Sequence, residues 1–196
     1  RVNKAKLDNF AENELGTLKD YLYSLFDNCP DEYFNSNLRS SQLKFRMNFN
    51  LDNLEEHEVN VLSKYGLIVN SERYKENHAK VQMFMLEHDN KTIAMEIPIW
   101  TGKDEILEHG DLFTASETNN FLTGHIDLLR IEDGKIWVWD YKPNAKRELY
   151  AATQVYFYAL MLSKRTGIDL DNFMCGYFDS NSAYVFNPSM KRDLLH

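Results

Sequence analysis

The chain has 196 residues and a hydrophobic content of 43%, which suits one ordinary domain with a proper core. Its 22 basic and 30 acidic residues give a formal net charge of -8, which argues against a protein that binds nucleic acid non-specifically through a basic surface. This charge does not exclude an enzyme that acts on nucleic acid, because divalent metal ions can offset carboxylates inside a site.

The first third of the chain is predicted to be mainly helical. A first amphipathic helix is indicated by apolar residues that recur at helical spacing, namely Leu7, Phe10, Ala11, Leu15, Leu18, Leu22, Leu25 and Phe26. The turn residues NCPD close this helix. A short helix is expected within residues 38–47, and a further helix over residues 51–65 ends at Gly66.

A fourth helix is predicted over residues 71–86. It places several larger side chains along one stripe, namely Tyr74, His78, Val81, Gln82 and Met85. Upstream of it, four acidic residues indicate a solvated helix face, namely Asp52, Glu55, Glu56 and Glu58. Four helices therefore precede the first predicted strand.

The hydrophobic period then changes from helical spacing to two. In TIAMEIPIW, residues 92–100, one face carries Ile93, Met95, Ile97 and Ile99, and Glu96 lies on the other face. Residues 121–131 and 135–142 are predicted to form the next two strands. The turn EDGK joins them, with Gly134 supplying a positive φ, so they should be antiparallel neighbours.

The last part of the chain returns to a helix and then to two short strands. The helix is predicted over residues 150–166 and ends at Gly167. FMCGYF and AYVF, residues 173–178 and 183–186, are strands on either side of the polar turn DSNS. After the N-terminal helices, the order is therefore helix, three strands, helix and two strands.

This order predicts an α/β fold in which a central mixed sheet is flanked by helices. Neither a repeat nor a low-complexity linker divides the sequence. We therefore expect one domain over residues 1–196, with a helical annex over residues 1–70 and an α/β core over residues 71–196.

The cysteines and the apolar runs limit the location and the cofactors. Cys29 and Cys175 are the only cysteines, too few for a four-thiolate zinc or iron–sulfur site, so no iron–sulfur cluster is expected. No apolar run approaches the roughly 20 residues that span a bilayer, and RVNKAKLDNF lacks the apolar centre of a signal peptide. We expect a cytoplasmic protein without a membrane partner.

Charged residues interrupt the two strands of the predicted hairpin. Asp140 and Lys142 point to the same face of their strand, and Asp127 can reach that face from the neighbouring strand. Two carboxylates that lie close together repel each other unless a cation lies between them, and Mg²⁺ or Mn²⁺ prefers such oxygen ligands. This pattern predicts a metal site that polarises a phosphodiester and activates water, with Lys142 beside the nucleophile or the phosphate.

Three motifs resemble those of a known family. GHIDLL followed by WVWDYKPN resembles the G-x-x-D and (D/E)-x-K elements of the PD-(D/E)XK nuclease superfamily, specifically of its RecB-like branch. Gln154 and Tyr158 in QVYFY are similar to the Q-x-x-x-Y element that this branch carries on the following helix. The ordered set spans about residues 78–158.

The resemblance implies a role for each matching residue. It implies metal ligands at Asp127, Asp140, the Tyr141 carbonyl and His78, and it implies that Lys142, Asp140 and Asp127 are catalytic. Supporting residues would be Gln154, Tyr158 and Glu96. His57 is the weaker histidine candidate, because its acidic neighbours indicate a solvated face.

Structural interpretations remain open beside these roles. His78 could be a core residue, and His125 could have a second-layer or surface role near Asp127. Gln154 and Tyr158 could simply close the helix against the sheet. The alternating aromatic residues Trp137, Trp139 and Tyr141 lie on the strand face opposite Asp140, which favours packing under a helix over base stacking.

The sequence therefore favours a Mg²⁺- or Mn²⁺-dependent DNA nuclease of the exonuclease type that acts on single- or double-stranded DNA. A helicase or another repair or phage-replication protein is the expected kind of partner. One alternative is a catalytically inactive nuclease-fold module that binds nucleic acid or protein. The other is a metal-binding or interaction domain that has no nucleic-acid role.

Overall fold

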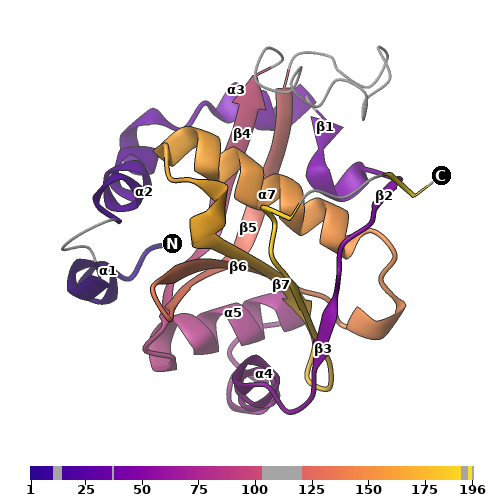
Figure 1. Cartoon of the computed structure of the whole chain (residues 1–196). Coiled ribbons are helices and arrows are strands. Elements are labelled where there is room, and N and C mark those ends of the chain that lie inside the picture. Colours follow the sequence, from indigo (N-terminus) through magenta and orange to yellow (C-terminus); the bar gives the residue numbers. More distant parts are fainter. Residues whose placement is uncertain (11–14, 37, 103–120, 191–193, 196) are drawn as a thin grey trace.

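The computed structural model describes residues 1–10, 15–36, 38–102, 121–190 and 194–195, and it places a mixed β-sheet between two layers of helices (Figure 1). The seven strands of this sheet are β1 Leu38–Arg39, β3 Asp52–Leu54, β4 Thr92–Gly102, β5 Phe121–Glu132, β6 Lys135–Tyr141, β7 Phe173–Phe178 and β8 Ala183–Phe186. Two further strands, β2 Arg46–Met47 and β9 Leu194–Leu195, form a small antiparallel pair.

The strand order confirms the predicted α/β fold with a central mixed sheet. It runs β1-β5-β6-β7-β8-β3, and β4 pairs with β5 outside this path. β5 is antiparallel to β4 and β6, whereas β6 and β7 are parallel. The predicted hairpin is present, and both Asp133 (φ 51°) and Gly134 (φ 71°) of its turn adopt positive φ.

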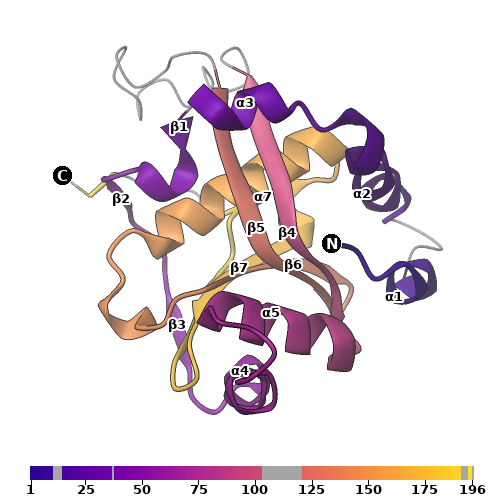
Figure 2. The same cartoon turned by 180° about the vertical axis from the view of Figure 1, so that it is seen from behind.

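Helices cover both faces of the sheet (Figure 2). On one face lies α7, Ala151–Thr166, which ends at Gly167 in the left-handed conformation as predicted. Its apolar side packs on a core that includes Ile126, Val138 and Phe173, and this core also receives α1, Lys4–Phe10, and α2, Gly16–Asn28.

The second face carries α4, Glu58–Val69, and α5, Asn77–His88. These helices bury Val59, Val81 and Met85 against a cluster that contains Trp139 and Tyr141, with Trp137 packed beside it. The prediction that the alternating aromatic residues pack under a helix, on the face opposite Asp140, is therefore confirmed. Among the described segments there are also the short helices α3 Asp31–Ser36, η1 Ser40–Gln42, η3 Ala145–Arg147 and η4 Leu170–Asn172.

Several N-terminal element predictions are wrong. Two helices, α1 and α2, are present where one helix was predicted. α2 begins at Gly16, and glycine is a poor helix former. Ala11, which was assigned to the predicted helix, lies outside the described residues. Residues 38–47 contain β1, η1 and β2 in place of a helix. A strand of two residues is too short to show the alternation of apolar and polar residues that identifies a strand. The apolar residues of residues 38–47 were therefore interpreted as one face of a helix. The division into an annex and a core at residue 70 stays a prediction, although β1 and β3 join the central sheet.

The third predicted helix is shifted along the chain. Residues 52–54 form β3, and α4 begins at Glu58 and continues past Gly66 to Val69. A Cβ at Gly66 would lie 3.0 Å from Phe84 Cβ, so this glycine permits close approach of α4 and α5 and does not end the helix. The prediction that the acidic residues form a solvated helix face is also wrong, because Asp52 lies in β3 and Glu58 forms ion pairs.

The fourth helix and the first long strand need smaller corrections. α5 begins at Asn77, six residues later than predicted, so Tyr74 packs against the core from the turn before it. Met95 packs with α5 and not with Ile97, because Glu96 between them has φ 49° and interrupts the alternation of the strand. Within the described part of the chain, no helix is both long and apolar enough to cross a membrane.

Candidate active site

A gap beside β5 creates the candidate site. One edge of β5 pairs along its length with β4, but the other edge pairs with β1 at residues 122–123 and with β6 only from residue 128 onward. The last pair of the β5–β6 ladder is Leu128 with Trp139, so the next residues in the same register are Asp127 and Asp140. The two strands separate at this point, and both carboxylates face the opening.

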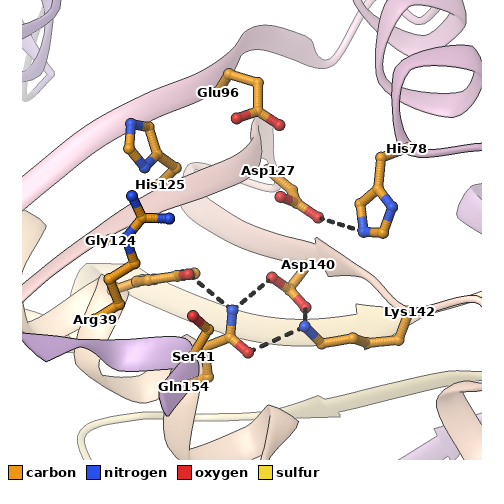
Figure 3. Close-up of a pocket in the computed structure, with 11 residues that line it drawn as sticks. Arg39, Ser41, His78, Glu96, Gly124, His125, Asp127, Asp140, Lys142 and Gln154 are labelled. Atoms are coloured by element: carbon orange, nitrogen blue, oxygen red, sulfur yellow. Dashed lines mark hydrogen bonds and ion pairs between the residues drawn. The ribbon is translucent and has the colours of Figure 1, made fainter. Parts of the chain in front are cut away.

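The opening is a pocket of about 270 Å³. Its lining residues are Arg39, Ser41, His78, Glu96, Gly124, His125, Asp127, Asp140, Lys142, Gln154 and Tyr158 (Figure 3). They come from β1, η1, α5, β4, β5, β6 and α7, and Lys142 directly follows β6. The structure therefore brings together all the predicted site side chains. Tyr141 does not line the pocket, but its backbone N–H donates to Asp127, and the role of its carbonyl stays a prediction.

A hydrogen-bond network holds the charged groups of β6 against α7. Lys142 Nζ lies 2.7 Å from Asp140 Oδ2 and donates to Gln154 Oε1 at 3.0 Å. The Gln154 amide in turn donates to Asp140 Oδ1 at 3.1 Å and to Tyr158 Oη at 2.7 Å. Gln154 thus fixes both members of the Asp140–Lys142 pair, which is more than closure of a helix against the sheet.

Gly124 is required by the position of Tyr158. A Cβ at residue 124 would lie 2.3 Å from Tyr158 Cε1, so any other residue would displace this ring. The ring is buried, and its hydroxyl accepts from Gln154. The glycine of the G-x-x-D motif therefore admits the tyrosine of the Q-x-x-x-Y motif, which links the two motifs physically.

The electrostatics of the pocket are dominated by two buried carboxylates. Burial, and then the charge of Asp140, raise the pKa of Asp127 well above its ordinary value, although the Tyr141 N–H donates to Asp127 Oδ2 at 2.8 Å. Burial lowers the pKa of Lys142, but the charge of Asp140 and its contact with the ammonium outweigh this effect, and the pKa is raised. Lys142 therefore stays protonated at neutral pH.

Asp127→Asn should stabilise the metal-free protein increasingly as the pH rises. The folded pKa of Asp127 lies above the unfolded value of about 3.9, so wild-type stability falls between that pH and the raised pKa. Asparagine keeps the acceptor for Tyr141 N–H and does not ionise. We expect the difference in Tm between variant and wild type, measured in EDTA, to grow from pH 4 to pH 7.

The matched control is Asp133→Asn, in the exposed turn of the same hairpin. Its Tm difference from wild type should not grow across this range, because the Asp133 side chain is exposed to water. A Tm difference for Asp127→Asn that stays constant from pH 4 to pH 7 would contradict the proposed repulsion.

His78 and Glu96 complete the acidic side of the pocket. His78 Nε2 lies 3.9 Å from Asp127 Oδ2, and the His78 side chain is 45% exposed. Its ring contacts the Tyr141 ring edge-on, with the two ring centres 5.0 Å apart. A core role for His78 therefore does not fit. Glu96 lies opposite Asp127 in the β4–β5 register, and Gln82 from α5 donates to its Oε1 at 2.6 Å.

The positive φ of Glu96 is unusual for a residue within a strand. Sparsely populated backbone conformations of this kind tend to occur at functional sites. In this case the conformation aims the side chain of Glu96 at the pocket (Figure 3).

The two remaining histidine predictions have different outcomes. His57 Nδ1 accepts from Val59 N and caps α4, and the ring lies beside Trp139, outside the residues that line the pocket. His125 lines the pocket and packs against Phe34 at 5.1 Å, and burial lowers its pKa. The second-layer or surface role of His125 therefore stays a prediction, although its ring is part of the pocket wall.

Sequence reasoning missed three polar residues of the site. Arg39 and Ser41 reach the pocket from β1 and η1, and Gln82 holds Glu96. The first two lie in the segment that was predicted to be helical. For Gln82, its place on the same helical stripe as His78 was the available signal.

The residues fit a hard divalent cation such as Mg²⁺ or Mn²⁺. Asp140 Oδ2 is buried and, apart from the ammonium of Lys142, receives no hydrogen bond from the described residues. Among these residues there is no group of three His, Cys, Asp or Glu side chains that could hold a metal ion unaided. That is compatible with Mg²⁺, which is usually bound by one or two carboxylates together with water and substrate phosphate.

Comparison with known proteins gives one match. A family model described as the PD-(D/E)XK nuclease superfamily matches residues 16–192, a range that includes every residue of the pocket. The comparison with curated proteins found no match.

Proposed function

The chain belongs to the PD-(D/E)XK nuclease superfamily, whose members are typically phosphodiester hydrolases, and we propose that it is a metal-dependent DNA nuclease. The observation that carries this proposal is the juxtaposition of Asp127, Asp140 and Lys142 in one open pocket. A structural module has no need for two buried carboxylates that repel each other, because such a pair destabilises the fold.

We propose that Asp127, Asp140 and the Tyr141 carbonyl hold Mg²⁺ or Mn²⁺, with His78 as a further ligand. When bound, the ion would polarise the phosphodiester and lower the pKa of a coordinated water. The residues of the chain then have separate tasks. The carboxylates orient the attacking water on one side of the phosphorus, and the ammonium of Lys142 stabilises the negative charge that develops as the P–O ester bond breaks.

Gln154 acts through Lys142 and is a positioning residue. Its carbonyl oxygen accepts from Lys142 Nζ, and its amide nitrogen is held by Asp140 and Tyr158, so the amide cannot turn without losing a hydrogen bond. The ammonium is therefore oriented before substrate arrives, which is the condition under which electrostatic stabilisation is most effective.

We assign the chain to the RecB-like branch and propose exonuclease action on DNA. The support for this assignment is the Gln154–Tyr158 pair and its contact with the G-x-x-D glycine. A helicase or another repair or phage-replication partner, and a cytoplasmic location, stay predictions. The alternative, an inactive nuclease-fold module, predicts that the protein binds nucleic acid or protein without cutting.

Incubation of the purified protein with labelled DNA tests the proposal. Linear duplex, circular duplex and single-stranded DNA, with an RNA of the same sequence, are incubated with Mg²⁺, Mn²⁺ or EDTA. We expect cleavage of linear DNA with metal, none with EDTA, and no cutting of circular DNA. Cutting of circles would make the enzyme an endonuclease, and binding without cleavage would support the inactive module.

His78→Ala tests the proposed additional ligand. Loss of a ligand should raise the metal concentration for half-maximal cleavage by about tenfold or more. His88→Ala is the matched control, because it removes a histidine from the other end of the same helix, where the side chain is 56% exposed. Equal metal requirements for the two variants would remove His78 from the ligand set.

A further inference from the structure

Five exposed basic residues extend from the pocket along one side, and we call them the basic rim: Arg39, Lys44, Arg46, Lys146 and Arg147. Arg39 lines the pocket itself. The others lie on β2, on η3 and just before β2. They come from two segments that are about 100 residues apart in the sequence, so the fold and not a local charge run brings them together.

Hydrogen bonds hold the first of these segments in place. β1 pairs with β5 next to Gly124, and Ser40 Oγ donates to the Thr123 carbonyl at 3.2 Å. Further along, Met47 N donates to Thr153 Oγ1 in the first turn of α7 at 3.0 Å. Residues 38–47 therefore run from the pocket to the beginning of α7.

The second segment meets the first at the same end of α7. Residues 142–150 connect β6 to α7, and the ammonium of Lys44 lies 5.3 Å from the ring centre of Tyr150. Figures 1 and 2 show residues 38–47 and 142–150 at the same end of α7 from both sides.

The rim is positively charged in a protein whose formal net charge is -8. Residues 38–47 and 143–150 contain its five cations and one acidic residue, Glu148. No described residue forms an ion pair with any of the five cations, whereas Lys19, Arg73 and Lys91 elsewhere on the surface are paired with carboxylates. α7 has no acidic residue in its first turn, so the positive end of its dipole adds to the same potential.

We propose that the basic rim binds the backbone phosphates of a nucleic-acid strand whose scissile phosphate lies in the pocket. This inference rests on the proposed nuclease function and adds the direction in which the substrate leaves the site. Arg39 lines the pocket, so it contacts the phosphate nearest to the scissile one. Its guanidinium group can bind two oxygens of that phosphate at once. Lys44, Arg46, Lys146 and Arg147 contact the phosphates that follow.

The opposite side of the pocket favours the same direction. It is formed by Glu96 and by the beginning of α5, where Glu76 precedes His78. Lys75 offsets the charge of Glu76, so the carboxylate of Glu96 in the pocket is the group that repels a polyanion on this side. The strand therefore leaves the pocket over the beginning of α7 and not over α5.

The test is the salt dependence of DNA binding in EDTA, where cleavage is blocked. Two double variants remove rim charges, Lys44→Ala/Arg46→Ala and Lys146→Ala/Arg147→Ala, and Lys64→Ala/Lys80→Ala removes two charges from α4 and α5 as a control. The logarithm of the DNA association constant falls linearly with the logarithm of the salt concentration. Each lost phosphate contact reduces the magnitude of this slope by about 0.7 for single strands and about 0.9 for duplex. Each rim variant should therefore lower the slope by roughly 1.4 to 1.8, and the control should leave it unchanged.

A labelled 20-nucleotide single strand and its duplex serve as the two probes, and whichever shows the change in slope is the form that crosses the rim. Thermal unfolding checks that the variants fold, which is expected because five of the six side chains are exposed and Lys80 is half-buried. If the wild type cuts DNA but the rim variants bind DNA with the same salt dependence as the wild type, the rim inference is wrong and the nuclease proposal stands. If the wild type neither binds nor cuts DNA, both fail.

Discussion

Lys142→Ala is expected to reduce DNA cleavage by about 10²–10³-fold or more in kcat, the range found when one preorganised donor to a developing negative charge is removed. The ammonium of Lys142 pairs with Asp140 and its charge also acts on Asp127, and Gln154 and Asp140 already hold it in place. Water that enters the vacated space can neither carry its charge nor keep its position. Single-turnover cleavage of linear DNA at saturating Mg²⁺ measures the loss.

Lys135→Ala is the matched control for this variant. Lys135 begins the same strand, β6, but its ammonium donates to the Asp171 carbonyl at the surface, outside the residues that line the pocket. Its removal should leave cleavage within about twofold of wild type, because no charge near the site changes. Cleavage by folded Lys142→Ala at a rate close to that of Lys135→Ala would remove Lys142 from the mechanism.

Asp140→Asn and Asp127→Asn should abolish cleavage as well, but with a different effect on stability. Asp140→Asn leaves Lys142 without its counter-ion, whereas Asp127→Asn relieves the repulsion between two buried carboxylates. A Tm comparison in EDTA at pH 7 should therefore place Asp127→Asn above Asp140→Asn. The two substitutions remove the same chemical group, so the difference reports their electrostatic environments.

The pairing of Asp127 with Asp140 could be predicted because it follows from a hairpin. Once the turn around Gly134 is identified, the antiparallel register brings the G-x-x-D aspartate opposite the D-x-K aspartate. The side-chain alternation of β6 then places Lys142 beside Asp140. Local rules were sufficient for these contacts, because all three residues lie within 16 positions of one another.

The other side of the pocket could not be predicted in this way. Arg39 reaches it from a strand of two residues that pairs with β5 across more than 80 positions of sequence, and so short a strand has no periodicity. The left-handed backbone of Glu96 also had no signal, because positive φ is expected at Gly, Asn or Asp. Gly66 was interpreted as a helix end, since a glycine that permits two helices to approach looks the same in a sequence.

Arg130→Met is expected to cause the largest loss of stability. Arg130 is fully buried, and its guanidinium lies 2.8 Å from Asp89, 2.6 Å from Glu58 and 3.1 Å from Glu132. Its removal leaves the buried carboxylate of Asp89 without the guanidinium that pairs with it, which costs about 3–5 kcal/mol. In a chain of this size that corresponds to a fall in Tm of roughly 6–20 °C, measured by calorimetry.

Double variants show which carboxylate is responsible for that loss. Arg130→Met/Asp89→Asn should recover a large part of the lost stability, because the Asp89 side chain is only 4% exposed. Arg130→Met/Glu58→Gln should recover little of it, because the Glu58 side chain is 47% exposed and solvated. Equal recovery in both would contradict this account. Arg130 is three positions from Asp127, but the three carboxylates with which its guanidinium pairs do not line the pocket, so the folded variant should cut DNA at the wild-type rate well below its Tm. A slower rate would mean that the ion cluster beneath α4 and α5 also positions the two carboxylates.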